Sequence, residues 1–309
     1  MSKGENKMTT CKKIPHTLFI WDFDWTVVNC NSDEYIPGQF ISDADLISGF
    51  HELYASLQDW HSCVEEIVSR AITNGATPDT ILDAARKMPY LTGVRKALDD
   101  IKEVGNSLTG QMILSDGNTM FISAFLEENG LVEHFTNGII TNEGSWDDSR
   151  LRVVHQSKQY GGHNCAQKCP ANLCKTQALQ DTLNRMLPKR NQEEMDMGCH
   201  EQERPRLVYV GDGANDACPV LNILQESDVL LARAGTKRGC ANLRSGPETD
   251  EEAECPTTVS EGSQFGILPA LDRAKQRDST VKCQVWEWSS GDELSSLVTK
   301  LLNDIPNSK

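Results

Sequence analysis

A short apolar run that ends in two aspartates constrains this chain more than any other feature. Residues 17–21 (TLFIW) are apolar after the first threonine, and Asp22 and Asp24 follow directly, with no basic residue beside them. A continuous apolar run of this length is typical of a strand buried on both faces of a parallel sheet. Two later runs end in the same way: Ser115, Asp116 and Asn118 follow MIL (112–114), and Asp212 and Asp216 follow LVYV (207–210).

These polar ends predict a common site. In open α/β sheets, sites form outside the carboxyl ends of the strands, so the acids converge if the three strands are neighbours. Carboxylates that converge in this way repel one another without a cation, and an all-oxygen acidic site suits Mg²⁺. Mg²⁺ held by one or two carboxylates usually completes its shell with water and phosphate oxygens. The sequence therefore predicts Mg²⁺ as cofactor and a small phosphorylated metabolite as substrate.

The order of elements predicts the fold class and two domains. Strands alternate with helices, which indicates an α/β core with a doubly wound, Rossmann-like parallel sheet. Residues 33–107 show helical spacing and are too long for a simple crossover. We therefore expect an all-helical cap at 33–107, inserted into a core formed by 14–32 and 108–309. Residues 150–170 are polar, and we expect them to be irregular.

Composition excludes several partners. The 309-residue chain has a formal net charge of -15 and a pI of about 4.9, without a long Lys/Arg block, so we expect no binding to nucleic acid or to anionic membranes. We find no secretory signal and no apolar stretch of about 20 residues, so no membrane span is expected. The 11 cysteines then predict reduced thiols and a cytoplasmic protein. Nothing in the sequence predicts an oligomeric state.

Several side chains suit phosphoryl transfer. Lys175 would supply a fixed positive charge for the transferring group, and the Ser115 hydroxyl can donate to a phosphate oxygen. An aspartate can form a covalent aspartyl-phosphate. The second aspartate of a pair can act as general acid toward the leaving oxygen and then as general base toward water.

Four motifs carry a family resemblance. In order, DFDWTVV, ILSDGN, CPANLCK and VGDGAND resemble the motifs of haloacid dehalogenase-like phosphohydrolases. The longer string DFDWTVVNCNSD, with CPANLCK and GDGANDACP, resembles more narrowly the subgroup of phosphoethanolamine/phosphocholine phosphatases and pyridoxal phosphate phosphatases. The likeness runs from about Leu18 to Arg233, and it implies a phosphatase with a helical cap after the first strand.

The resemblance implies a role for each matched residue: Asp22 as nucleophile, Asp24 as general acid/base with its backbone carbonyl on Mg²⁺, Ser115 and Lys175 at the phosphate, Asp212 as metal ligand, and Asp216 as the residue that holds metal-bound water. Asp22, Asp24, Asp212 and Asp216 are thus the candidate metal ligands. Asn118, in the same ILSDGN motif as Ser115, is a further candidate for substrate binding.

Asp33 and Asp116 have two interpretations. Neither is needed for phosphoryl transfer, and two extra acids facing the substrate would suit a cationic leaving group such as an amino alcohol. Alternatively, Asp33 caps a helix and Asp116 binds local backbone N–H groups. Phosphoethanolamine- or phosphocholine-type substrates are expected first, with pyridoxal phosphate or thiamine monophosphate as the alternative. A regulatory protein that only binds a phosphometabolite is a third hypothesis, against which the intact Asp24 argues.

A cysteine-rich segment has no assigned role. His163, Cys165, Cys169 and Cys174 lie close together in sequence and could bind zinc, but their spacing also fits small buried thiols around a turn. Trp25, between the acid/base and Thr26, cannot be assigned from chemistry. The polar segments 189–205 and 244–264 read as surface insertions.

Overall fold

The computed structural model describes residues 15–105, 107–159, 165, 169, 172–187, 204–234 and 266–305. Within these ranges, seven strands form one sheet in the order β4-β3-β2-β1-β5-β6-β7, parallel except for the antiparallel pair β3–β4. The strands are β1 (Thr17–Trp21), β2 (Thr109–Asn118), β3 (Ile139–Asp147), β4 (Arg150–Val154), β5 (Arg206–Gly211), β6 (Val229–Arg233) and β7 (Gln284–Trp288). The predicted doubly wound α/β fold is confirmed.

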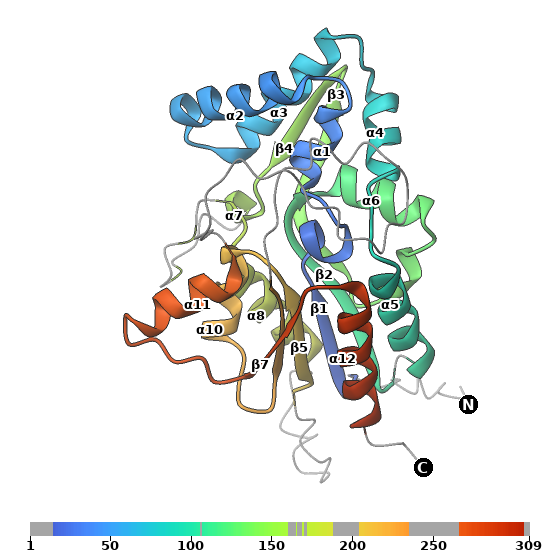
Figure 1. Cartoon of the computed structure of the whole chain (residues 1–309), viewed down its shortest axis with the longest axis vertical. Coiled ribbons are helices and arrows are strands. Elements are labelled where there is room, and N and C mark those ends of the chain that lie inside the picture. Colours follow the sequence, from blue (N-terminus) through green and yellow to red (C-terminus); the bar gives the residue numbers. More distant parts are fainter. Residues whose placement is uncertain are drawn as a thin grey trace, which may run out of the picture.

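Helices cover both faces of the sheet (Figure 1). They are α1 (Ser32–Gly38), α2 (Asp43–Leu57), α3 (Trp60–Thr73), α4 (Pro78–Arg86), α5 (Thr92–Val104), α6 (Thr119–Glu128), α7 (Gln156–Gln159), α8 (Lys175–Met186), α10 (Ala217–Asn222), α11 (Ile267–Lys275) and α12 (Gly291–Asn303). Side chains of β1 alternate between two cores: Phe19 and Trp21 pack with α5, α6 and α12, whereas Leu18 and Ile20 pack with α8, α10 and α11. This double burial explains why β1 has no polar face.

The helices between β1 and β2 do not all belong to one layer. Helices α1 to α4 gather at one end of the sheet, whereas α5 lies beside α12 along its flank and also packs on β2 (Figure 1). A Cβ on Gly93 would come within 2.1 Å of the Gly291 carbonyl, so the starts of α5 and α12 approach this closely only because residue 93 is a glycine. We therefore propose that the cap comprises α1 to α4 and that α5, although inside the expected range 33–107, is part of the core.

The prediction of an irregular segment at 150–170 was wrong at its start. Strand β4 forms a hairpin with β3, and its side chains alternate between buried and exposed positions, with Leu151 and Val153 buried. The other positions carry the exposed Arg150 and Val154 and the half-buried Arg152, and the two arginines made this strand look polar in sequence. The hairpin supports the cap, because Glu65 of α3 accepts a hydrogen bond from the backbone of Val153 (2.7 Å) and pairs with Arg152 (3.4 Å).

Among the described residues, no helix combines the length and apolar character that a membrane crossing requires. The segment 244–264 lies outside the described residues, as does 189–205 apart from its last two positions. Those two predicted insertions stay predictions.

Candidate active site

Three adjacent strands deliver the predicted site residues to one edge of the sheet. Strand β1 pairs with β2 on one side and β5 on the other, with Trp21 opposite both Ile113 and Val210. The residues that follow these strands therefore meet, as predicted. Carboxylate oxygens of Asp22, Asp212 and Asp216 all lie within 4.8 Å of one another, and all three side chains are buried.

Lys175 lies between two of these carboxylates. Its Nζ is 2.9 Å from Oδ1 of Asp22 and 2.7 Å from Oδ1 of Asp216, and the side chain is 1% exposed. Burial alone lowers the pKa of a lysine, but Asp216 and Asp22 outweigh burial and hold the Lys175 pKa well above its usual value. The lysine is thus a permanent positive charge in contact with Asp22, although the two residues are far apart in sequence.

Asp216 is saturated by hydrogen bonds. Besides Lys175, Oδ1 accepts from the Tyr209 hydroxyl (2.7 Å), and Oδ2 accepts from the backbone N–H groups of Asp212 (3.0 Å) and Gly213 (2.9 Å). Burial raises the pKa of Asp216, but Lys175 and these donors lower it overall, so the group stays ionised. A carboxylate has about four lone-pair sites, and here four donors use them. The geometry therefore gives Asp216 the task of positioning Lys175 and the turn that carries Asp212.

Tyr209 was not predicted as a site residue. It is fully buried, and burial together with Asp216 raises its pKa well above the usual value, so it remains a hydrogen-bond donor to Asp216. Within LVYV, Tyr209 looks like one more apolar residue of a buried strand. Its hydroxyl was the available signal, because a buried tyrosine usually needs a polar partner.

The two aspartates after β1 enter different surroundings. Asp22 joins the cluster around Lys175, whereas Asp24 accepts hydrogen bonds from the backbone N–H (2.9 Å) and hydroxyl (3.1 Å) of Ser32. Burial and then Asp216 raise the pKa of Asp22, against the opposing effect of Lys175. Burial and then Asp33 raise the pKa of Asp24, against the hydrogen bonds from Ser32. Two neighbouring carboxylates in unlike environments can take different roles.

Trp25, unassigned by sequence, lies in the turn η1 (Phe23–Val27), which follows Asp22 and contains Asp24. Its backbone lies in the left-handed region (φ 57°), which is unfavourable for a bulky residue. Arg233, at the end of β6, donates to the Trp25 carbonyl (2.6 Å) and to Oδ1 of Asn29 (2.6 Å). Its guanidinium also lies over the rings of Trp25 and Trp288, 5.7 and 5.0 Å from their centroids. Contacts from distant strands therefore stabilise the strained turn.

The polar residues at the end of β2 serve different purposes. Ser115 is fully buried, and its hydroxyl oxygen accepts from the backbone N–H of Gly117 (3.1 Å), which leaves its proton available for donation. The Asn118 side chain instead caps α6 by accepting from the backbone of Phe121 (3.1 Å), so its oxygen is engaged in a structural bond. Asp116 accepts from the side chain of Asn215 (2.9 Å), a residue of the GDGAND motif.

Asp33 reaches the site from the first cap helix. Its Oδ2 accepts from the indole of Trp60 (2.7 Å), whereas its Oδ1 is buried without a hydrogen-bond partner among the described residues. Burial raises the Asp33 pKa, and Asp116 raises it further, against His61 and the Trp60 bond. Asp33 and Asp116 both raise the pKa of Asp24. The three carboxylates are therefore close enough to influence one another.

A buried network links the cap to the core, and sequence reasoning missed it. Nε2 of His61, on α3, lies 2.9 Å from both Nδ2 of Asn142 and Oδ1 of Asn172. The Asn142 amide also donates to the carbonyls of Asp116 (2.7 Å) and Gly117 (3.0 Å), the turn that carries Ser115. Asn172 stands inside CPANLCK and was therefore detectable, whereas His61 and Asn142 belong to no motif.

Comparison with known proteins agrees with this geometry. The family model described as Putative Phosphatase matches residues 17–239. The pyridoxal phosphate phosphatase PHOSPHO2 of Mus musculus is 30% identical over 71% of this chain and 82% of its own length. The phosphoethanolamine/phosphocholine phosphatase of Homo sapiens is 29% identical (72% and 75%), and inorganic pyrophosphatase 2 of Arabidopsis thaliana is 24% identical (94% and 86%).

The match of the family model spans more than half of the chain and includes all four motifs. The predicted resemblance to phosphoethanolamine/phosphocholine phosphatases and pyridoxal phosphate phosphatases is thereby confirmed. The chain belongs to the Putative Phosphatase family, and it is an enzyme, a phosphoric monoester hydrolase.

Proposed function

We propose that the protein is a Mg²⁺-dependent phosphatase that works through an aspartyl-phosphate on Asp22. We further propose that it prefers small phosphomonoesters with a cationic alcohol, such as phosphoethanolamine or phosphocholine. The observation that carries the proposal is the different surroundings of the two aspartates after β1: Asp22 contacts the buried Lys175, whereas Asp24 accepts hydrogen bonds from Ser32 and is influenced by Asp33 and Asp116.

The donor set fits Mg²⁺. The cluster contains three buried carboxylates and one lysine, which contacts two of them, so it keeps an excess of negative charge, and its possible metal ligands are carboxylate oxygens. Because Asp216 is saturated, Asp22 and Asp212, together with the backbone carbonyl of Asp24, are the groups that would hold the ion. When bound, Mg²⁺ would neutralise charge on the phosphate oxygens.

The side chains account for both steps of hydrolysis. A carboxylate oxygen of Asp22 attacks phosphorus, the bond to the leaving oxygen breaks, and Asp24 gives that oxygen its proton. Lys175 and the Ser115 hydroxyl donate to the phosphate oxygens during the transfer. Asp24 then takes a proton from water as the water attacks phosphorus, which releases phosphate and restores the Asp22 carboxylate.

The surroundings of Asp24 support the cationic leaving group. Asp24 must face the leaving oxygen, and Asp33 and Asp116 lie near it. Oδ1 of Asp33 is buried without a partner among the described residues, and a substrate ammonium would supply one. Burial, together with Asp33, also raises the pKa of Glu34 to about 7, a further sign of crowded acids. Pyridoxal phosphate and thiamine monophosphate remain the alternative substrates.

The described cysteines are not joined by disulfides, which favours the expected cytoplasmic location.

A phosphate-release assay over a small panel tests this proposal. With Mg²⁺, phosphoethanolamine and phosphocholine are expected to give higher kcat/KM than pyridoxal phosphate, thiamine monophosphate, pyrophosphate and an uncharged alkyl phosphate. Chelation of Mg²⁺ by EDTA should abolish release, and added Mg²⁺ should restore it. Full turnover in EDTA would contradict the metal assignment, and a preference for the uncharged ester would contradict the substrate assignment.

A double variant isolates the acids near the leaving group. Asp33→Asn with Asp116→Asn is expected to lower kcat/KM for phosphoethanolamine by about 10- to 100-fold relative to an uncharged alkyl phosphate, because two charge-assisted contacts of about 1.5–3 kcal/mol each are weakened. The ratio between substrates is the readout, since loss of negative charge also favours phosphate binding in general. Asp79→Asn, an exposed acid of the cap, is the matched control. An unchanged ratio would show that neither acid recognises the substrate.

A further inference from the structure

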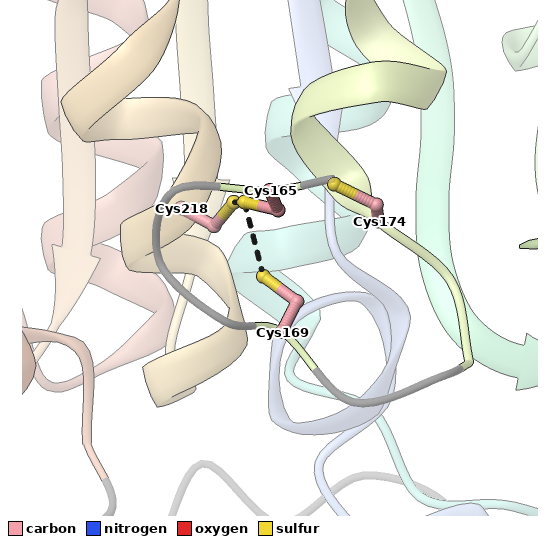
Figure 2. Close-up of side chains that lie close together, drawn as sticks. All are labelled: Cys165, Cys169, Cys174 and Cys218. Carbon is pink, nitrogen blue, oxygen red and sulfur yellow. Dashed lines mark hydrogen bonds between the residues drawn. The ribbon is translucent and has the colours of Figure 1, made fainter. Parts of the chain in front are cut away.

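Four cysteine thiols gather at one point outside the phosphoryl-transfer site. The sulfur atoms of Cys165, Cys169, Cys174 and Cys218 all lie within 4.8 Å of one another, and they converge from different directions (Figure 2). Cys165 Sγ is 3.0 Å from Cys218 Sγ and 3.5 Å from Cys169 Sγ. The first three cysteines precede or adjoin α8, whereas Cys218 belongs to α10.

We propose that this cluster binds one Zn²⁺ ion as a structural four-thiolate site. Zinc takes four ligands in a tetrahedron with Zn–S bonds of about 2.3 Å, which places the sulfurs roughly 3.8 Å apart. The distances between the four sulfur atoms, from 3.0 Å for Cys165–Cys218 to at most 4.8 Å, bracket this value. Soft thiolates without oxygen ligands select zinc over Mg²⁺. The zinc hypothesis from sequence named His163, which lies outside the described residues; the fourth ligand in the structure is Cys218.

Polar groups lie beside two of the four sulfurs. The Thr176 hydroxyl lies 2.8 Å from Cys218 Sγ, and the backbone N–H of Gln177 bonds to Cys174, so each of these two sulfurs has a polar neighbour that would help to orient it as a ligand. Cys174 also stands at the N-terminus of α8, whose dipole favours negative charge. The other described cysteines are not part of this cluster and are buried: Cys30, Cys63 and Cys283.

The position of the cluster explains what zinc would contribute. Cys174 directly precedes Lys175, and Cys218 follows Asp216 by two residues. A metal held by both cysteines would join the start of α8 to α10. These are the two helix starts next to which Lys175 and Asp216 form their ion pair. Because a preformed site rarely exists in the unfolded chain, zinc binding would also stabilise the fold.

Metal content of the full-length protein tests the proposal. Protein purified in reducing buffer without added metal is expected to contain one zinc per chain by elemental analysis. A thiol-specific mercurial should release it stoichiometrically, and stripped protein should take up Co²⁺ with a thiolate-to-cobalt charge-transfer band. Cys169→Ser, outside the regular elements, should reduce zinc to near zero, whereas the matched control Cys283→Ser should keep one zinc.

Three results would overturn the proposal. The first is zinc-free fresh protein whose thiols all titrate and which binds no Co²⁺. The second is a disulfide between these cysteines, found by mass spectrometry in protein handled under reducing conditions. The third is full zinc content in Cys169→Ser. The Co²⁺ measurement uses the unaltered chain, so the test holds even if a variant fails to fold, and none of the readouts depends on phosphatase activity.

Discussion

Asp22→Asn is expected to lower kcat at least about a thousandfold on every phosphomonoester that the protein hydrolyses. The amide has nearly the same shape, but it cannot displace the leaving group to form an aspartyl-phosphate. It also removes the negative charge that lies 2.9 Å from Lys175 Nζ. Steady-state phosphate release, measured with saturating Mg²⁺ and substrate, gives the change in kcat.

The control is Asp79→Asn, which carries the same chemical change on an exposed part of α4 and should keep wild-type kcat. Circular dichroism and the melting temperature show whether the Asp22 variant is folded. A folded Asp22→Asn protein with full turnover on any phosphomonoester would exclude Asp22 as the nucleophile. Covalent labelling supports the same test, since trapped phosphate should map to Asp22 in the wild type and be absent from the variant.

Asp24→Asn should lower kcat by about 10²- to 10⁴-fold, the usual contribution of a general acid or base. The two steps respond differently, because an aryl phosphate has a good leaving group that hardly needs a proton, whereas water still needs a base. With an aryl phosphate we therefore expect a burst of about one equivalent of phenol, followed by slow turnover. Rapid mixing with absorbance detection measures the burst and the later rate separately.

Ser32→Ala is the informative companion to this variant. It removes the hydroxyl that lies 3.1 Å from Asp24 but keeps the carboxylate and the backbone N–H bond, so kcat should fall much less than in Asp24→Asn. If Asp24→Asn shows no burst and retains its rate on alkyl and aryl phosphates alike, Asp24 is not the acid/base. If the loss is equal for both ester types without a burst, the role of Asp24 is structural, because loss of a general acid alone would affect the alkyl ester more than the aryl ester.

Much of the fold could be predicted because the strands are buried on both faces. Strand β1 is buried on both faces, and so are its two neighbours in the sheet, β2 and β5. Each strand therefore reads as a continuous apolar run followed by polar residues, a pattern that a single sequence is enough to reveal. Strand β4 was missed for the opposite reason, since its arginines alternate with buried Leu151 and Val153. Helix α5 has ordinary helical spacing, and only the close approach of Gly93 to Gly291 shows that it packs with the core.

The candidate site likewise has features that the sequence could predict and features that it could not. Motifs named Asp22 and Asp212 at the ends of strands and Lys175 at the start of α8, because phosphoryl transfer calls for those residue types. They could not show that Asn118 caps α6 or that Asp216 is saturated by four donors. Those facts depend on the direction of each side chain and on partners from distant segments.

By itself, the sequence determined the α/β core, the edge of the sheet at which the acids meet, and the phosphatase family, because local burial patterns and short motifs encode them. Only the tertiary structure decided which groups compensate the charges. Lys175 comes to Asp22 through the packing of α8, Arg233 supports the turn at Trp25 from the end of β6, and Cys218 joins three distant thiols through α10. Such partners are set by the three-dimensional path of the chain, and sequence spacing carries no record of that path.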